Sequence, residues 1–123
     1  MKRYGKELIL DLHFCDQTTF TRDSIKKYFV GLCKNIEMKR AKLTWWDDHN
    51  VPEDERQTAP HLKGISAVQF IITSNIVIHT LDLLGAVYIN IFSCKDFDAE
   101  VAKEFSANWF KGNIVNSYEI DRL

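Results

Sequence analysis

Three apolar runs follow one another closely in the second half of the chain. They cover residues 64–72, 76–78 and 86–92, and short polar links separate them. Links this short join neighbouring strands in an antiparallel arrangement, because a parallel crossover needs about a dozen residues or more. The three runs therefore predict adjacent strands in a mainly antiparallel sheet.

The first third of the chain changes from strand periodicity to helix periodicity. Apolar residues at every second position predict a strand over 7–14 with one buried face. Its predicted buried positions are Leu8, Leu10, Leu12 and Phe14. Helical spacing follows, and Thr21 or Asp23 is the expected N-cap of this helix. Its apolar positions are Ile25, Tyr28, Phe29, Leu32, Cys33 and Ile36.

The remaining elements complete a two-layer fold. Strands are predicted over 39–46 and 114–120. A second helix is predicted to start at Asp98 and to end near Gly112. Its predicted packing face holds Val101, Phe105 and Trp109. The element order predicts a single α+β domain over 1–123, a two-layer sandwich with helices on one face of a mainly antiparallel sheet.

The segment 47–62 interrupts this pattern. Its first part, 47–60, holds both prolines of the chain and five acidic side chains, so it cannot form part of the core. We interpret the segment as a solvated loop, here called the acidic loop. A role as a lid or specificity loop is the alternative, because long loops in small domains are often functional.

Composition excludes several classes of partner. The chain has 16 Lys and Arg against 17 Asp and Glu, so nucleic acid and anionic membranes are not expected partners. No run has the length of a membrane span or a signal segment, which predicts a cytoplasmic protein. The three cysteines, Cys15, Cys33 and Cys94, lack metal-ligand spacing. Free thiols are expected, and neither disulfides nor a metal site.

A polar triplet, Thr73-Ser74-Asn75, separates two of the apolar runs. If the strands pair as a meander, Ser74, His79 and Cys94 can converge. From residue types and spacing alone, structural roles are favoured: a serine in a turn, a histidine at a strand end and a buried cysteine. The chain has no nucleophile elbow, P-loop, zinc-protease motif or dinucleotide-binding glycine cluster.

Several motifs together resemble the prokaryotic S-adenosylmethionine decarboxylase family. The chain reads GIS at 64–66, TSNIVIHT at 73–80 and NIFSC at 90–94. Members of that family typically read G-V-S, then E-S-H-x-x-I-H-T, then a strand ending D-I-F-T-C-G. The opening GKELILDL at 5–12 is similar to the first strand of the family. The resemblance spans nearly the whole chain apart from the acidic loop, and the joint spacing of Ser66, Ser74, His79 and Cys94 makes it specific.

The resemblance implies a pyruvoyl enzyme that cleaves itself. Ser74 matches the serine that attacks the carbonyl of Thr73, so that cleavage gives chains 1–73 and 74–123 with a pyruvoyl group at residue 74. His79 matches the proton acceptor in processing, and Ser66 matches a hydroxyl that assists it. Cys94 matches the acid that protonates the substrate after carbon dioxide leaves. The pyruvoyl carbonyl would form a Schiff base with the substrate amine, and no metal or nucleotide cofactor is expected.

The same resemblance implies a small-molecule substrate, S-adenosylmethionine, and a place in polyamine (spermidine) biosynthesis. It also implies a homodimer with each active site near the interface. The family holds adenine between aromatic rings, and Trp45 and Trp46 are the candidates for substrate binding. Leu83 stands where the family has a glutamate that binds the ribose hydroxyls, so ornithine or arginine remains an alternative substrate.

Two further departures keep a different function class open. Thr73 and Asn75 stand where the family has Glu and His. An unprocessed paralogue that acts as a binding or regulatory subunit is therefore the second hypothesis.

Overall fold

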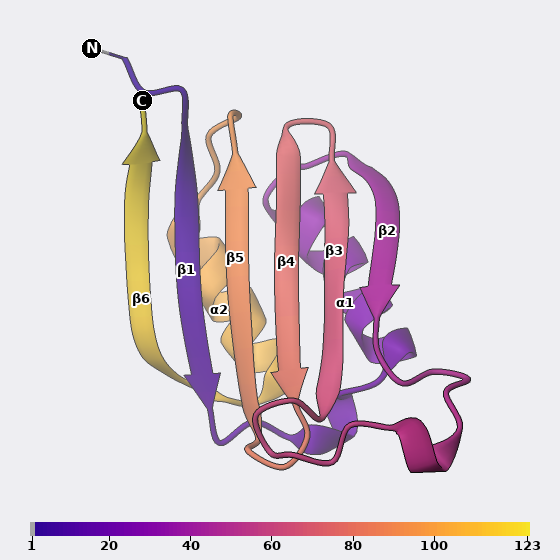
Figure 1. Cartoon of the computed structure of the whole chain (residues 1–123). Helices are drawn as coiled ribbons and strands as arrows, with labels where there is room; N and C mark the ends of the chain where they lie inside the picture. The colour runs from indigo at the N-terminus through magenta and orange to yellow at the C-terminus, as the bar shows by residue number, and fades with distance from the viewer. Residues whose placement is uncertain (1) are drawn as a thin grey trace.

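All six strands belong to one antiparallel sheet in a computed structural model that describes residues 2–123 (Figure 1). The order of the strands across the sheet is β2-β3-β4-β5-β1-β6, and every neighbouring pair is antiparallel. The strands are β1 (Gly5–His13), β2 (Arg40–Trp46), β3 (Gly64–Ile71), β4 (Ser74–Leu81), β5 (Ala86–Ser93) and β6 (Asn113–Arg122). The antiparallel sheet predicted from the short links is confirmed.

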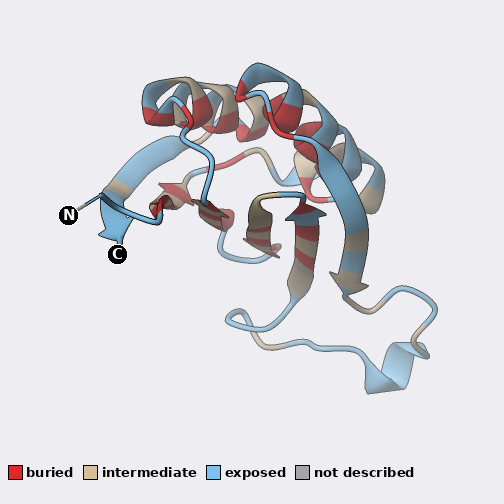
Figure 2. Ribbon diagram, turned by 90° about the horizontal axis from the view of Figure 1, so that it is seen from above, coloured by how far each residue is buried: buried red, intermediate tan, exposed pale blue. Residues whose placement is uncertain are grey.

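Two helices, α1 (Arg22–Asn35) and α2 (Ala99–Phe110), cover one face of this sheet (Figures 1 and 2). Thr21 caps α1 by accepting from the Ser24 N–H, and Asp98 caps α2 by accepting from the first turn. Two short 3-10 turns, Gln17–Thr19 and Glu53–Glu55, lie in connecting segments. The predicted α+β sandwich with helices on one face is confirmed.

The core lies between the helices and the sheet, where Figure 2 shows the buried residues. Alternate residues of the central strands point into it, as period-two spacing requires. The fully buried strand positions include Leu8, Leu10, Leu12, Ile76, Ile78 and Ile91. All six apolar positions predicted for the first helical segment are buried as well. The opposite face of the sheet carries no helix, so its side chains are only partly covered.

One buried position predicted for the first strand is wrong. Phe14 is 79% exposed and has a φ of 57°. Regular β1 ends at His13, and the chain turns there so that the Cys15 N–H donates to the Gly85 carbonyl at 2.9 Å. Because the turn interrupts the pleat, Phe14 no longer follows the side-chain alternation of the strand.

The residues predicted for the packing face of the second helix, Val101, Phe105 and Trp109, pack against the core but are only partly buried. Its fully enclosed residues are Ala99, Ala102, Ser106 and Phe110. Phe105 and Trp109 are half-buried and lie beside Tyr28 of α1, at ring distances of 5.9 and 6.2 Å, so they pack between the helices. The helix ends at Lys111, which has a φ of 52°, and Gly112 lies beyond it. A Cβ at Gly112 would come within 2.4 Å of the Cys15 sulfur, so glycine is needed for this close approach.

Truncating the centre of the sheet should destabilise the protein strongly. Ile78 is fully buried and lies opposite Ile89 and Ala67 in the register. We predict that Ile78→Ala lowers the free energy of unfolding by about 2–5 kcal/mol, because it removes buried methyl groups and leaves a cavity. The matched control is Val115→Ala on the exposed edge strand β6, expected to change it by about 0.5 kcal/mol or less. Urea denaturation checks both; equal effects would contradict the described core.

Candidate active site

The turn between β3 and β4 places Ser74 at the start of β4. Only Ile72 and Thr73 separate the two strands, and Ile71 lies opposite Ser74 in the register. Ser74 has a φ of 154°, a value that glycine adopts readily and residues with a side chain adopt rarely. Such a conformation costs on the order of 1–3 kcal/mol in a residue with a side chain. The strain therefore lies directly at the peptide bond between Thr73 and Ser74.

The carbonyl of Thr73 is held in place by the chain that follows β5. The Cys94 N–H donates a hydrogen bond to this carbonyl oxygen at 3.1 Å. The hydroxyl of Thr73 lies 2.8 Å from the hydroxyl of the fully buried Ser93. On the other side of the bond, the Asn75 amide donates to the Ser74 Oγ at 3.1 Å. A strained serine thus lies next to a carbonyl that already has a hydrogen-bond donor on its oxygen.

Ser66 and His79 form a second polar pair, on the face of the sheet without helices. They lie opposite each other in the β3–β4 register, and the Ser66 Oγ is hydrogen bonded to His79 Nδ1. Both side chains are half-buried. An imidazole nitrogen can either accept or donate a hydrogen bond, so a proton can pass between the Ser66 hydroxyl and the His79 ring.

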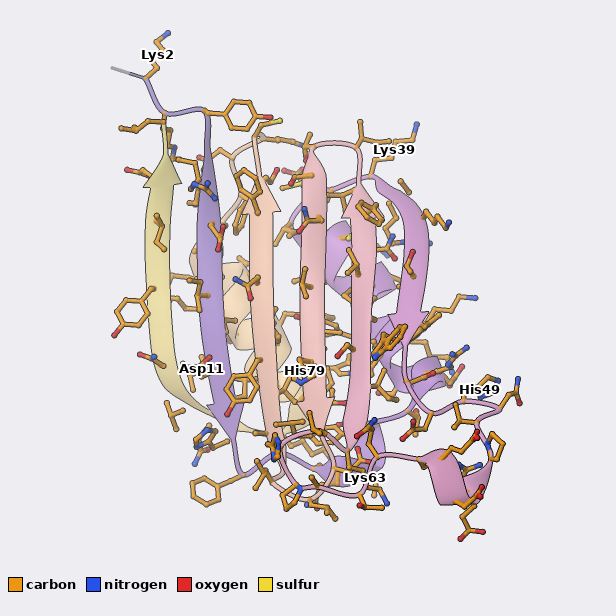
Figure 3. All side chains as sticks on the ribbon, viewed as in Figure 1. Lys2, Asp11, Lys39, His49, Lys63 and His79 are labelled. Carbon is orange, nitrogen blue, oxygen red and sulfur yellow. The ribbon has the colours of Figure 1, made fainter. Side chains whose placement is uncertain are left out.

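The two pairs lie apart within one chain. Ser74 and His79 are five residues apart on β4, which corresponds to about 17 Å at the usual rise of an antiparallel strand. Figure 3 shows His79 in the half of β4 nearer its C-terminal end, whereas Ser74 begins the strand. The structure therefore brings Ser74 together with Cys94, and Ser66 together with His79. The predicted convergence of Ser74, His79 and Cys94 therefore does not occur within one chain, because His79 lies far from the other two.

The two tryptophans point to opposite faces of β2. Trp45 packs against the core and lies under the guanidinium of Arg22, which is 5.1 Å from its ring. Trp46 is 84% exposed and lies opposite Ser66 in the register. Only Trp46 is therefore close to the Ser66–His79 pair.

A cavity of about 460 Å³ lies between Trp46, the Ser66–His79 pair and the acidic loop. As expected, the loop carries no strand and is mostly exposed (Figures 1 and 2). Its first residue is anchored, because Arg22 Nε and an Arg22 terminal nitrogen each donate to the Asp47 carboxylate at 2.7 Å. This pairing lowers the pKa of Asp47. The loop thus forms one wall of a cavity with the Ser66–His79 pair on another.

Leu83 lies in the turn between β4 and β5 and is 55% exposed. No group of three or more His, Cys, Asp or Glu residues within 2–123 has an arrangement that could hold a metal ion. Neither described helix has the length and hydropathy needed to cross a membrane.

The sequence patterns did not identify three residues of the site, Ser93, Asp48 and Glu55. The Ser93 hydroxyl is hydrogen bonded to the Thr73 hydroxyl and so links the β3–β4 turn to the end of β5. In the sequence, Ser93 could have been noticed as a polar residue that continues the buried alternation of Ile89 and Ile91. Asp48 and Glu55 line the cavity from the acidic loop. No local motif marks these two among the five acidic residues of the segment, because only the path of the loop brings them to the cavity.

Comparison with known proteins identifies a family and a related fold. A family model described as S-adenosylmethionine decarboxylase matches residues 6–123. Among solved structures, the chain resembles the crystal structure of the adenosylmethionine decarboxylase from Aquifex aeolicus VF5, with a TM-score of 0.77 and 19% sequence identity. The similarity covers 99% of this chain and 92% of that one, and at this identity it shows a shared fold. Comparison with curated proteins gives no match.

The anchor of the acidic loop should stabilise the protein in a pH-dependent way. Because Arg22 lowers the pKa of Asp47, the stabilisation is complete above the unfolded-state pKa of about 4 and is lost as pH falls through the lower folded-state value. We predict that Asp47→Asn costs roughly 1 kcal/mol at neutral pH and nothing in strong acid. Urea denaturation across this range checks it, with the exposed Asp54→Asn as control. A difference that persists in strong acid would contradict this role.

Proposed function

The chain belongs to the S-adenosylmethionine decarboxylase family, whose members are pyruvoyl-dependent carboxy-lyases, and on this premise we propose that Ser74 is its pyruvoyl precursor. The family resemblance noted in the motifs is confirmed. The observation that carries the proposal is the strained Ser74 beside a Thr73 carbonyl that accepts from the Cys94 N–H. These residues fit a pyruvoyl group because they supply both the nucleophile and the carbonyl needed to make it.

The proposed processing starts with the Ser74 Oγ. It attacks the Thr73 carbonyl carbon, the peptide C–N bond breaks, and an ester joins the two parts of the chain. Negative charge develops on the Thr73 oxygen during this attack, where the Cys94 N–H acts as a hydrogen-bond donor. Loss of the Ser74 α-proton then breaks the ester C–O bond, residues 1–73 leave with a carboxylate, and hydrolysis of the remaining enamine releases ammonia and gives the pyruvoyl group.

The residues around this terminus have distinct proposed roles in decarboxylation. A pyruvoyl carbonyl accepts the electron pair that the departing carboxyl group leaves behind. Cys94 follows the end of β5, and its side chain is exposed. Its backbone N–H is hydrogen bonded to the Thr73 carbonyl. The thiol is therefore near residue 74 and available to deliver a proton to the substrate carbon. Ser66 and His79 supply the proton exchange required in processing.

The distance between the pairs supports a homodimer with shared sites. Ser66 and His79 of one chain are about 17 Å from Ser74 of the same chain, too far for direct proton transfer. The helix-free face between them carries partly exposed apolar side chains among polar ones, and a second copy of the chain could cover these apolar residues. Its apolar residues include Ile9, Val68, Phe70, Val77, Phe92 and Ile120. Two such faces packed in opposite directions would bring Ser66 and His79 of one protomer to Ser74 of the other.

Two substrate classes have support. Family membership favours S-adenosylmethionine and a role in polyamine biosynthesis. The exposed Leu83 favours a second candidate, a short amino acid such as ornithine or arginine, because leucine cannot accept the hydrogen bonds of ribose hydroxyls.

Self-cleavage should depend on Ser74. We predict that the purified protein separates under denaturing conditions into chains 1–73 and 74–123, and that Ser74→Ala stays intact because it lacks the nucleophile. Denaturing electrophoresis checks this, with Ser117→Ala on β6 as a control that cleaves normally. A wild-type chain that stays full length, like Ser74→Ala, would instead support the unprocessed binding or regulatory paralogue.

Two inactive variants should rescue each other if the sites are shared. His79→Ala and Ser74→Ala are each expected to remain uncleaved alone. In a mixed dimer, His79 of the Ser74→Ala chain lies beside Ser74 of the His79→Ala chain, so we predict that the His79→Ala chain is cleaved. Co-expression with tags of different size, followed by purification through one tag, checks this. Mixed dimers that remain uncleaved would rule out sites shared between protomers.

A further inference from the structure

Lys6 is a buried charge to which the proposed reaction assigns no role. Among the Lys, Arg, Asp and Glu residues of 2–123, it alone is buried, with 7% of its surface exposed. A lysine is almost never buried unless its ammonium group is paired, because removing the charge from water is costly. The partners of this ammonium group therefore indicate what the residue does.

The Lys6 ammonium contacts two residues of the segment 94–98, which joins β5 to α2 and is here called the Cys94 segment. Lys6 Nζ donates to the Phe97 carbonyl at 2.5 Å and lies 3.2 Å from the Asp96 carboxylate. It also lies 4.6 Å from the centre of the Phe97 ring, within the range of a cation–π interaction. One buried side chain thus holds the Cys94 segment through a backbone carbonyl, a carboxylate and an aromatic ring.

The start of β1 also lies against Cys94 itself. Lys6 is opposite Ser93 in the β1–β5 register, and Figure 1 shows the start of β1 beside the end of β5. A Cβ at Gly5 would come within 2.3 Å of the Ser93 carbonyl oxygen and 2.9 Å of the Cys94 Cα, so glycine is needed for this close approach. The start of β1 therefore limits where the backbone of Cys94 can lie.

A second basic residue binds the same carboxylate in a much more exposed position. An Arg3 terminal nitrogen lies 2.7 Å from the Asp96 carboxylate, but these side chains are 37% and 71% exposed. Exposed ion pairs contribute little, because water screens the charges and both side chains lose freedom. Lys6 is therefore the stronger of the two anchors of the Cys94 segment.

We propose that Lys6 is the positioning residue of Cys94: it holds the Cys94 segment so that the Cys94 N–H stays on the Thr73 carbonyl and the thiol stays beside residue 74. This inference rests on the proposed function, because it assigns Lys6 to the steps in which Cys94 takes part. Negative charge develops on the Thr73 oxygen during cleavage, and a group misplaced by about 1 Å can cost on the order of 100-fold in rate. Lys6 acts only through the position of Cys94.

Hydrogen exchange measured by NMR tests this role without relying on turnover. In the uncleaved Ser74→Ala chain, the Thr73 carbonyl still protects the Cys94 N–H. Adding Lys6→Met should speed exchange of this amide at least about tenfold, because a hydrogen bond to a charged group contributes about that factor or more to an equilibrium. The amides within β5 should keep their rates. Equal acceleration throughout β5, which indicates general destabilisation, or none at Cys94 would overturn the inference.

Arg3→Met is the matched control for this measurement. It removes the other cation from Asp96, so an effect that came from the charge of this carboxylate alone would appear in both variants. We expect exchange at Cys94 to stay within about twofold in Arg3→Met, because the Arg3 pair is exposed. Equal acceleration in Arg3→Met and Lys6→Met would contradict a specific role of Lys6.

Self-cleavage of chains that retain Ser74 provides the second measurement. Lys6→Met should cleave about tenfold more slowly, a smaller loss than the roughly 10²–10³-fold that follows complete removal of such a donor. Lys6→Arg should retain most of the rate, because a guanidinium group also donates to carbonyl and carboxylate oxygens. Lys103→Met is the control that cleaves normally, because Lys103 is also partly buried but pairs with Glu100 of its own helix at 2.9 Å.

The two measurements separate this inference from the proposed function. Faster exchange at Cys94 together with slower cleavage in Lys6→Met supports both. Unchanged cleavage in Lys6→Met overturns the inference and leaves Ser74 as the pyruvoyl precursor. A wild-type chain that never cleaves overturns the proposed function, whereas Lys6-dependent exchange at Cys94 in that chain still supports the anchoring of Cys94.

Discussion

The register of β4 between β3 and β5 is the constraint on which the rest of the site depends. It places Ser66 opposite His79, and Ser74 opposite Ser93 next to Cys94. A shift by one residue would turn Ile76 and Ile78 away from the core, so the buried face of the strand fixes the positions of its reactive side chains. The packing of the core thus also sets the positions of the residues proposed for catalysis.

This register also explains why strain is tolerated at Ser74. Three hydrogen bonds fix the turn that precedes it. The Ile72 N–H donates to the Lys39 carbonyl at 3.0 Å, and Thr73 is hydrogen bonded to both Ser93 and Cys94. Such surroundings can maintain an unfavourable φ that an isolated turn would relax. Conversion of the Thr73–Ser74 peptide to an ester would release this strain, so the proposed cleavage would have a local driving force in addition to the reactivity of the hydroxyl.

Periodicity and motif spacing could predict the layers, the strand order along the chain and the family, because each depends on local pattern. Phe14 could not be placed from pattern, since the tertiary contacts of Cys15 decide where the strand turns. The end of the second helix near Gly112 could be predicted, although the contact of Gly112 with Cys15 could not. The five-residue spacing of Ser74 and His79 implies a separation of about 17 Å once both residues are known to lie on one continuous strand. The sequence left that continuity open, because the turn at the polar triplet could have ended later than it does. The positions of the Asp48 and Glu55 carboxylates depend on the path of the acidic loop, and the sequence of this loop has no repeating pattern from which the path could be predicted.

The central claim is that residue 74 is converted from a serine to a pyruvoyl group. The intact mass of the smaller chain under denaturing conditions tests it most directly. We expect a fragment that begins at residue 74 and is lighter by one ammonia than the peptide 74–123 with an amino-terminal serine. A fragment with the mass of the serine form would show hydrolysis without formation of the pyruvoyl group, and a single species of 123 residues would show no processing. Either result would contradict the formation of a pyruvoyl group at residue 74.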